Sequence, residues 1–241
     1  MKHDDIDPRS CLAEIDEKEK PLCALSDRIW EYAETAFEEF QSAEALAAFL
    51  EREGFSVERG AYGIPTAFTG TFGTDGPRIG ILGEFDALSG LNQTAGATRK
   101  ESENPGANGH GCGHNLLGVG SVAAALAVKK YIQSGFPGTV VYYGCPGEEG
   151  GSGKAFMARS GAFSNLDCAL AWHPSALNMV YQNTSLANFQ LQYTFHGVSA
   201  HAAGSPEMGR SALDALELMN VGINFLREHM LEKARVHYAI T

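Results

Sequence analysis

The 241-residue sequence lacks a long uninterrupted run of apolar residues. Its longest apolar stretch, 116–128, has 13 residues broken by glycines, whereas a helix that spans a bilayer needs about 20. The first ten residues are polar and acidic, unlike a secretory signal. The five cysteines are odd in number and scattered, so no disulfide framework is indicated. We therefore expect no membrane partner and a reducing, cytoplasmic location.

The sequence also lacks an excess of positive charge. It has 18 Lys and Arg against 29 Asp and Glu, a net charge of −11. Residues 1–60 alone hold 16 acidic and 7 basic side chains, which indicates one solvated acidic face. Nucleic acids and anionic membranes attract clustered Lys and Arg, so the charge excludes both as partners. The 44% of hydrophobic residues also excludes a disordered chain, because that content is typical of a globular core.

Apolar runs that alternate with helical patterns predict an α/β fold with a mostly parallel sheet. From about residue 179 the pattern changes to strand, amphipathic helix and strand, which predicts a second domain. The expected strands are 66–72, 78–82, 139–143 and 168–172, then 186–195 and 234–240; the expected helices are 10–54, 114–132, 153–160 and 211–228.

The densest group of chemically useful residues lies at 109–115, where Cys112 and His114 stand among glycines. Thiolate and imidazole are ligands for zinc-like metals, and glycines let the backbone fold tightly around an ion. Cys-x-His alone is weak evidence, since a glycine-rich turn with an incidental cysteine gives the same letters. The segment predicts a metal site only if other ligands lie nearby.

Other candidate ligands follow the predicted strands. Glu148 and Glu149 lie in a glycine-rich loop after one strand, and His173 follows the next. Open α/β sheets bind ligands at the carboxyl ends of their strands, so one glutamate could bind metal while its neighbour acts as general base. The alternative for the glutamates is a solvated acidic turn. Asp86 follows a further strand, where its carboxylate could orient a ligating imidazole.

Two other chemistries use part of this set. Cys112 with a nearby histidine could act as a thiol nucleophile, and Glu148 with a second carboxylate could suit a glycosidase. Both leave His173 and most of the cysteine–histidine cluster without a role. We therefore rank metal-dependent hydrolysis above them.

Five segments together resemble the M20 family of metallopeptidases and amidohydrolases, in particular the branch with p-aminobenzoyl-glutamate hydrolases and related dipeptidases. The likeness runs in the family's order from about residue 29 to the end. The segments are Gly83–Leu88, His110–Asn115, Pro146–Gly151, Trp172–Pro174 and Gly197–Ala202.

The resemblance implies a zinc-peptidase-like catalytic domain over 1–182 and, from 183, the start of an inserted α+β lid or dimerisation domain. In the family the catalytic domain resumes after the lid and supplies a final histidine ligand. This chain ends within the lid, so we expect a truncated fragment that is inactive alone.

The resemblance also assigns roles by position. Glu148 matches the general base, and His201 a lid histidine that reaches the active site of the dimer partner. Asp86 matches the carboxylate of the family's His-x-Asp motif, whose histidine position holds Glu84, leaving the role of Glu84 open. The implied metal ligands are Cys112, His114, Glu149 and His173.

The resulting hypothesis is a metal-dependent amidohydrolase that cleaves an N-acyl amino acid, with p-aminobenzoyl-glutamate as the leading candidate. One or two divalent ions are expected: Cys112 favours zinc and the carboxylates admit manganese. Arg210 could bind a substrate carboxylate. The alternatives are a dipeptidase or aminoacylase, or a non-catalytic remnant that binds metal or a partner. The expected assembly is a homodimer, or a heterodimer with a related A-type protein, through the lid.

Overall fold

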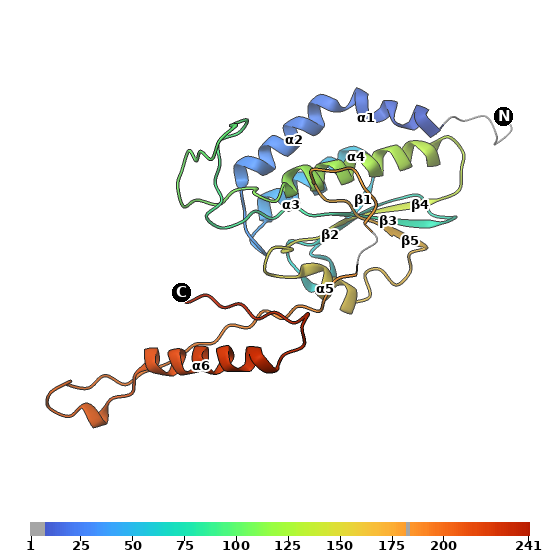
Figure 1. The fold of residues 1–241 in the computed structure, drawn as a ribbon. Helices are drawn as coiled ribbons and strands as arrows, with labels where there is room; N and C mark the ends of the chain where they lie inside the picture. The colour runs from blue at the N-terminus through green and yellow to red at the C-terminus, as the bar shows by residue number, and fades with distance from the viewer. Residues whose placement is uncertain (1–7, 182–183) are drawn as a thin grey trace. The chain divides into compact units, whose positions relative to one another are not determined.

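The computed structural model describes residues 8–181 and 184–241 of the chain, which form two compact units, each with its own fold (Figure 1). The first unit ends at Gln182 and the second begins at Asn183. The expected boundary between 182 and 183 therefore lies on two residues outside the described part.

The first unit is built on one five-stranded sheet with the order β1-β2-β4-β3-β5. β3 pairs in parallel with β4 and β5, whereas β1 with β2 and β2 with β4 are antiparallel. The α/β class is confirmed, but the sheet is mixed rather than mostly parallel. A short connection without a crossover helix joins β1 to β2, and such connections join antiparallel neighbours. The strands are β1 Ser56–Arg59, β2 Phe68–Phe72, β3 Arg78–Gly83, β4 Thr139–Gly144 and β5 Cys168–Leu170.

Helices cover both faces of this sheet (Figure 1). The expected helical region 10–54 is three helices rather than one. Its main break falls at residues 33–39, where Ala33 and Phe37 have left-handed backbone (φ 43° and 66°) that no helix accommodates. The helices are α1 Ala13–Glu17, α2 Glu19–Tyr32, α3 Phe40–Arg52, α4 His114–Gln133 and α5 Gly153–Arg159.

The central strand β4 shows how the core is divided. Its side chains alternate: Val140 and Tyr142 pack in the cluster formed with α2, α3 and α4, while Val141 and Tyr143 pack with Met157 of α5. All six residues of β4 are buried, as expected of a strand covered on both faces. This packing fixes the edge of the sheet at which β3, β4 and β5 end.

The second unit is built around α6 (Ala212–Leu226), whose N-cap Ser211 accepts a hydrogen bond from the backbone N–H of Asp214 at 3.0 Å. The predicted helix 211–228 is confirmed, with the bounds Ala212–Leu226. The expected strands 186–195 and 234–240 are wrong, because neither segment is paired with another strand in the described chain. An extended segment becomes a strand only when its backbone N–H and C=O groups find such a partner. None of the described helices combines the length and hydropathy that a membrane span requires.

Candidate metal centre

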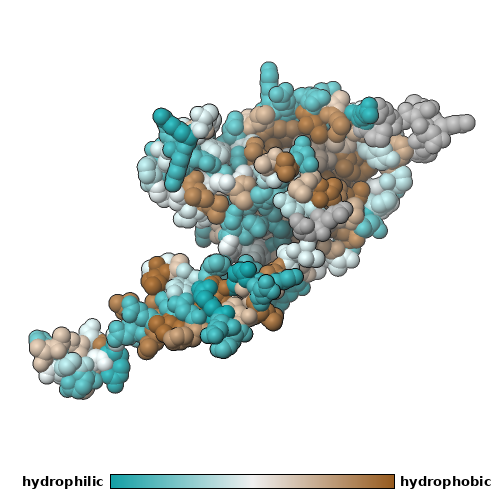
Figure 2. Space-filling model, viewed as in Figure 1, coloured by the Kyte–Doolittle hydropathy of each residue, from teal (hydrophilic) through white to brown (hydrophobic). Residues whose placement is uncertain are grey.

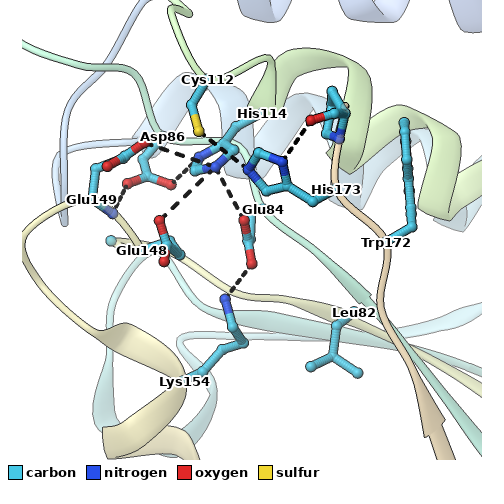
Figure 3. A network of polar contacts seen from close by, with 12 residues as sticks. Leu82, Glu84, Asp86, Cys112, His114, Glu148, Glu149, Lys154, Trp172 and His173 are labelled. Atoms are coloured by element: carbon cyan, nitrogen blue, oxygen red, sulfur yellow. Dashed lines mark hydrogen bonds and ion pairs between the residues drawn. The ribbon is translucent and has the colours of Figure 1, made fainter. Parts of the chain in front are cut away.

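The candidate site lies where β3, β4 and β5 reach the same edge of the sheet. Asp86 follows β3, Glu148 and Glu149 follow β4, and His173 follows β5 (Figure 3). These strands are parallel neighbours, so the loops after them gather their side chains at one place. The register of the sheet thereby brings together segments that lie far apart in the sequence.

The beginning of α4 supplies two more side chains. His114 is its first residue, and Gly113 before it has a left-handed backbone (φ 77°) that glycine adopts without strain. A side chain at Gly113 would also press on Pro174, 3.1 Å away. The turn at Gly113 therefore lets Cys112 and His114 both face the site.

Hydrogen bonding fixes which nitrogen His114 presents. Its Nδ1 lies 3.0 Å from Oδ1 of Asp86, and both side chains are fully buried. When Nδ1–H donates to this carboxylate, the lone pair of Nε2 points into the site, as in many metal-binding histidines. Burial alone would lower the pKa of His114, but the hydrogen bond to Asp86 and the nearby Glu84 and Glu149 raise it. The surroundings therefore favour a positive charge at Nε2, whether a proton or a metal ion.

His173 is oriented in the same way from the other side. Its Nδ1 donates to the carbonyl oxygen of Pro174 at 2.8 Å, which leaves Nε2 as an acceptor. That Nε2 lies 3.1 Å from Sγ of Cys112, and the His173 and His114 rings stand nearly perpendicular, 5.6 Å apart. Nε2 of His114, Nε2 of His173 and Sγ of Cys112 therefore lie close together, and each can offer a lone pair to the same ion.

The surroundings of Cys112 argue against a thiol nucleophile. Burial, followed by the hydrogen bond and charge of Glu149, raises the pKa of Cys112 to about 12. Such a thiol is protonated at neutral pH, and only the thiolate attacks. A bound metal ion would deprotonate it, so Cys112 suits a ligand better than a nucleophile.

The donor atoms fit a divalent metal ion. Two groups of three have ligand atoms within 4.8 Å of one another: Cys112, His114 and His173, and Glu84, His114 and Glu148. Within the described chain, Nε2 of His114 and Oε2 of Glu84 are buried without a hydrogen bond, although they lie 3.1 Å apart. Two acceptors so placed need a cation. Sulfur and imidazole ligands are those of zinc, and the carboxylates also suit manganese.

The two adjacent glutamates approach the same nitrogen. Oε2 of Glu148 lies 3.9 Å and Oε1 of Glu149 lies 4.0 Å from Nε2 of His114. Burial and the charges of Glu84 and Glu149 raise the pKa of Glu148, and a raised pKa makes a carboxylate a better base near neutral pH. Glu149 belongs to neither group of three, so its role as ligand stays a prediction.

Lys154 is a site residue that the sequence did not reveal. Its Nζ pairs with Oε1 of Glu84 from the first turn of α5, and Glu84 in turn faces His114 (Figure 3). Lys154 thereby brings a positive charge to a centre with four carboxylates. A basic residue directly after the glycine-rich loop was the signal available for it.

The sequence matches the peptidase family M20/M25/M40 over residues 80–231, which include every site segment described above. The chain belongs to this family.

Two relatives of this M20 chain carry the names of different enzymes. It is 58% identical over 218 residues to the B-type chain of p-aminobenzoyl-glutamate hydrolase from Escherichia coli (strain K12), covering 90% of this chain and 45% of that protein. It is 34% identical over 242 residues to the Xaa-Arg dipeptidase of Mus musculus, covering 95% and 52%. The chain thus spans about half the length of these relatives.

Solved structures share the fold of the M20 chain. The structure of a putative aminohydrolase from methicillin-resistant Staphylococcus aureus superposes with a TM-score of 0.62 at 22% identity. The match covers 94% of this chain and 59% of the aminohydrolase chain. A dinuclear metal-binding M20 peptidase from Bacillus subtilis matches 64% and 42% with a TM-score of 0.54 at 21% identity. At these identities the likeness concerns the fold alone.

Two predicted functional residues of the M20 chain lie in the second unit. Nδ1 of His201 accepts from the backbone N–H groups of Ala203 and Gly204 at 3.2 and 3.0 Å, which leaves Nε2–H as an exposed donor. Nη1 of Arg210 donates to the carbonyl oxygens of Glu207 and Gly209. The roles of His201 and Arg210 at the metal centre stay predictions. The remaining predicted residues are brought together: Asp86, Cys112, His114, Glu148, Glu149 and His173.

Proposed function

We propose that this chain is the metal-binding part of an amidohydrolase that cleaves the amide bond of an N-acyl amino acid. The observation that carries the proposal is the convergence of Sγ of Cys112, Nε2 of His114 and Nε2 of His173 beside two carboxylates. Glu149 completes the proposed ligand set. One or two divalent ions, zinc or manganese, are the proposed cofactor.

The roles of the side chains follow from their contacts. A divalent ion, when bound, supplies a Lewis acid that polarises the carbonyl and lowers the pKa of water. Glu148, raised in pKa and partly exposed, takes the proton of the attacking water and passes it to the leaving amine. Asp86 holds the ring of His114 and also accepts the backbone N–H of Glu149 at 2.8 Å. Asp86 thereby orients both an imidazole and the loop that carries the base.

The proposed substrate is p-aminobenzoyl-glutamate, split into p-aminobenzoate and glutamate. The identity of 58% to the Escherichia coli protein named for this activity supports it. Arg210 is the proposed contact for the substrate carboxylate, because guanidinium binds carboxylates in two-pronged geometry. The second candidate is dipeptide hydrolysis, favoured by the 34% identity to a dipeptidase.

The proposed assembly is a dimer through residues 183–241 as the lid, with residues 1–182 as the catalytic domain. The partner is a second copy or a related A-type protein, since the A-type chain of the same Escherichia coli hydrolase is 25% identical to this chain. α6 has no buried residue, and hydrophobic surface is visible in the second unit (Figure 2). Leu218 is 72% exposed and Phe225 is 73% exposed. Such a face is typical of an interaction surface.

The scattered cysteines support the proposed cytoplasmic location.

Metal content and turnover are measured on one preparation of the protein extended to the full length of its matched relatives, because this chain spans about half of that length. Zinc and manganese are quantified by elemental analysis, and release of p-aminobenzoate and glutamate is compared with release from dipeptides, using Glu148→Gln as the matched control. Metal-dependent release that Glu148→Gln abolishes supports the proposal. Stoichiometric metal without turnover of any amide would instead identify a non-catalytic metal-binding protein. Faster cleavage of dipeptides would assign the second candidate function.

A further inference from the structure

We propose that Glu39 is a positioning residue that holds the loop 145–153, and with it Glu148 and Glu149, in the geometry of the metal centre. The inference rests on the proposed function, because the loop matters only if the centre binds metal. Glu39 itself is not one of the proposed ligands. Glu39 comes from the connection between α2 and α3, residues 33–39, here named the clamp segment.

Glu39 is a buried carboxylate that needs an explanation. It is 0% exposed, and in the described chain no Lys or Arg forms an ion pair with it. Isolated buried carboxylates are costly, so they are rare without a compensating partner. Oε1 of Glu39 accepts the backbone N–H of Gly147 at 2.7 Å, across 108 residues of sequence. The buried acceptor therefore serves the loop that carries the two glutamates.

That loop depends on support from outside itself. Gly147, Gly150 and Ser152 all have left-handed backbone (φ 61°, 74° and 55°), which is unfavourable for Ser152 in particular. The loop closes on itself through the bond from Gly153 N–H to the Gly147 carbonyl at 3.1 Å. Such a backbone keeps one conformation only when its surroundings over-determine it.

Phe37 provides a second contact from the clamp segment. A Cβ at Gly147 or Gly151 would lie 2.8 or 2.6 Å from the Phe37 ring, so the loop rests against the ring with no space for a side chain. The ring closes one side of the loop, and Glu39 anchors its backbone. Together they leave the loop little freedom to shift.

The clamp segment also fixes the other catalytic loop. The backbone N–H of Ala87, the residue after Asp86, donates to the carbonyl of Glu34 at 2.7 Å, and Thr35 forms a bridge with Ala87. Asp86 in turn accepts the backbone N–H of Glu149 at 2.8 Å. One short segment therefore ties together the loops after β3 and β4, whose spacing sets the distance between Asp86 and the two glutamates.

Three variants separate this role from simple packing. Glu39→Met keeps the length of the side chain but has no acceptor, Glu39→Gln keeps an acceptor for Gly147, and Glu38→Met is the matched change at the neighbouring glutamate, which is not buried. Amide hydrogen exchange at Gly147 is followed by NMR, and zinc affinity by competition with a chromogenic chelator. Both are measured on the full chain, and neither requires turnover.

In wild type and Glu39→Gln we expect a protected Gly147 amide and equal zinc affinity. In Glu39→Met we expect rapid exchange at Gly147 and zinc affinity reduced by about 10- to 100-fold, the loss typical of an outer partner of a ligand. Glu149→Gln combined with Glu39→Met should bind zinc no more weakly than Glu149→Gln alone, because both act through one loop.

An unprotected Gly147 amide in wild type would overturn the inference, and so would full protection or unchanged zinc affinity in Glu39→Met. Losses as large in Glu38→Met would indicate a general effect on packing and would overturn it too. If wild type binds no zinc, the proposed function fails, while exchange at Gly147 still decides whether Glu39 holds the loop.

Discussion

At the scale of single residues, chemically identical side chains acquire different tasks from their surroundings. Glu84 pairs with Lys154, Glu39 accepts a backbone N–H in the core, and Glu148 is partly exposed beside His114. The residue type is the same in each case, and the difference lies in burial and partner. Substitutions by glutamine remove charge with little change of shape, so they test these tasks directly.

Glu148→Gln and Glu149→Gln should separate catalysis from metal binding. We expect Glu148→Gln to keep its metal and lose rate by about 10²- to 10⁴-fold, the usual contribution of general acid–base catalysis. Glu149→Gln should lose metal, because a neutral amide is a weaker ligand than a carboxylate. Elemental analysis and steady-state kinetics, carried out on a full-length version of the protein, measure both effects. Equal metal loss in the two variants would contradict the assignment.

Glu39 should make stability depend on pH. Burial raises the pKa of Glu39 above its ordinary 4.5, against the opposing backbone N–H groups of Glu39, Phe37 and Gly147. The folded state then holds the proton of Glu39 more tightly than the unfolded chain does. Protonated Glu39 therefore adds to the free energy of unfolding below pH 4.5, and this contribution is lost as the pH rises through the raised pKa. Glu39→Gln should remove that decline. Denaturant unfolding of both proteins from about pH 4.5 to neutrality measures it, and parallel stability curves would refute it.

At the scale of elements, the close approach of α4 to the sheet positions the site. A Cβ at Gly118 would lie 2.7 Å from the backbone oxygen of Glu84, directly at the candidate centre. Gly118 lets the first turns of α4 lie against the segment that follows β3. Glycine lowers the helix propensity of α4, but it allows the helix to approach Glu84 closely.

Gly118→Ala and Gly222→Ala form a matched pair in two helices. Alanine improves helix propensity by about 1 kcal/mol, and nothing lies within 4 Å of a Cβ at Gly222 in α6. We expect Gly222→Ala to stabilise by about 0.5–1 kcal/mol. Gly118→Ala should destabilise by about 1–3 kcal/mol, the usual cost of overpacking, and weaken metal binding. Denaturant unfolding measures both, and stabilisation by both alanines would show that α4 can move away freely.

At the scale of the whole molecule, the proposed assembly places functional residues on different protomers. Nε2–H of His201 is an exposed donor, and loss of one such donor to a developing oxyanion costs about 3–4 kcal/mol. Mixing inactive His201→Ala with inactive Glu148→Gln protomers should restore about a quarter of wild-type activity, if random exchange forms symmetric dimers. Activity of refolded mixtures, with mixed dimers verified by differential tags, measures it. Inactive mixed dimers would place His201 within its own chain's site or outside catalysis.

The sequence by itself predicted the α/β class, most strand and helix positions of the first unit, and six side chains that lie together in the candidate metal centre, though not Lys154. Those signals are local: hydrophobic periodicity, glycine-rich turns and short motifs lie within a few residues. The tertiary structure alone decided the antiparallel placement of β2, the lack of strand pairing at 186–195 and 234–240 in the described chain, and the contacts Glu84–Lys154 and Glu39–Gly147. Strand pairing and the burial of a charge depend on groups far apart in the chain. They are set when distant segments compete for the same partners, which no local pattern records.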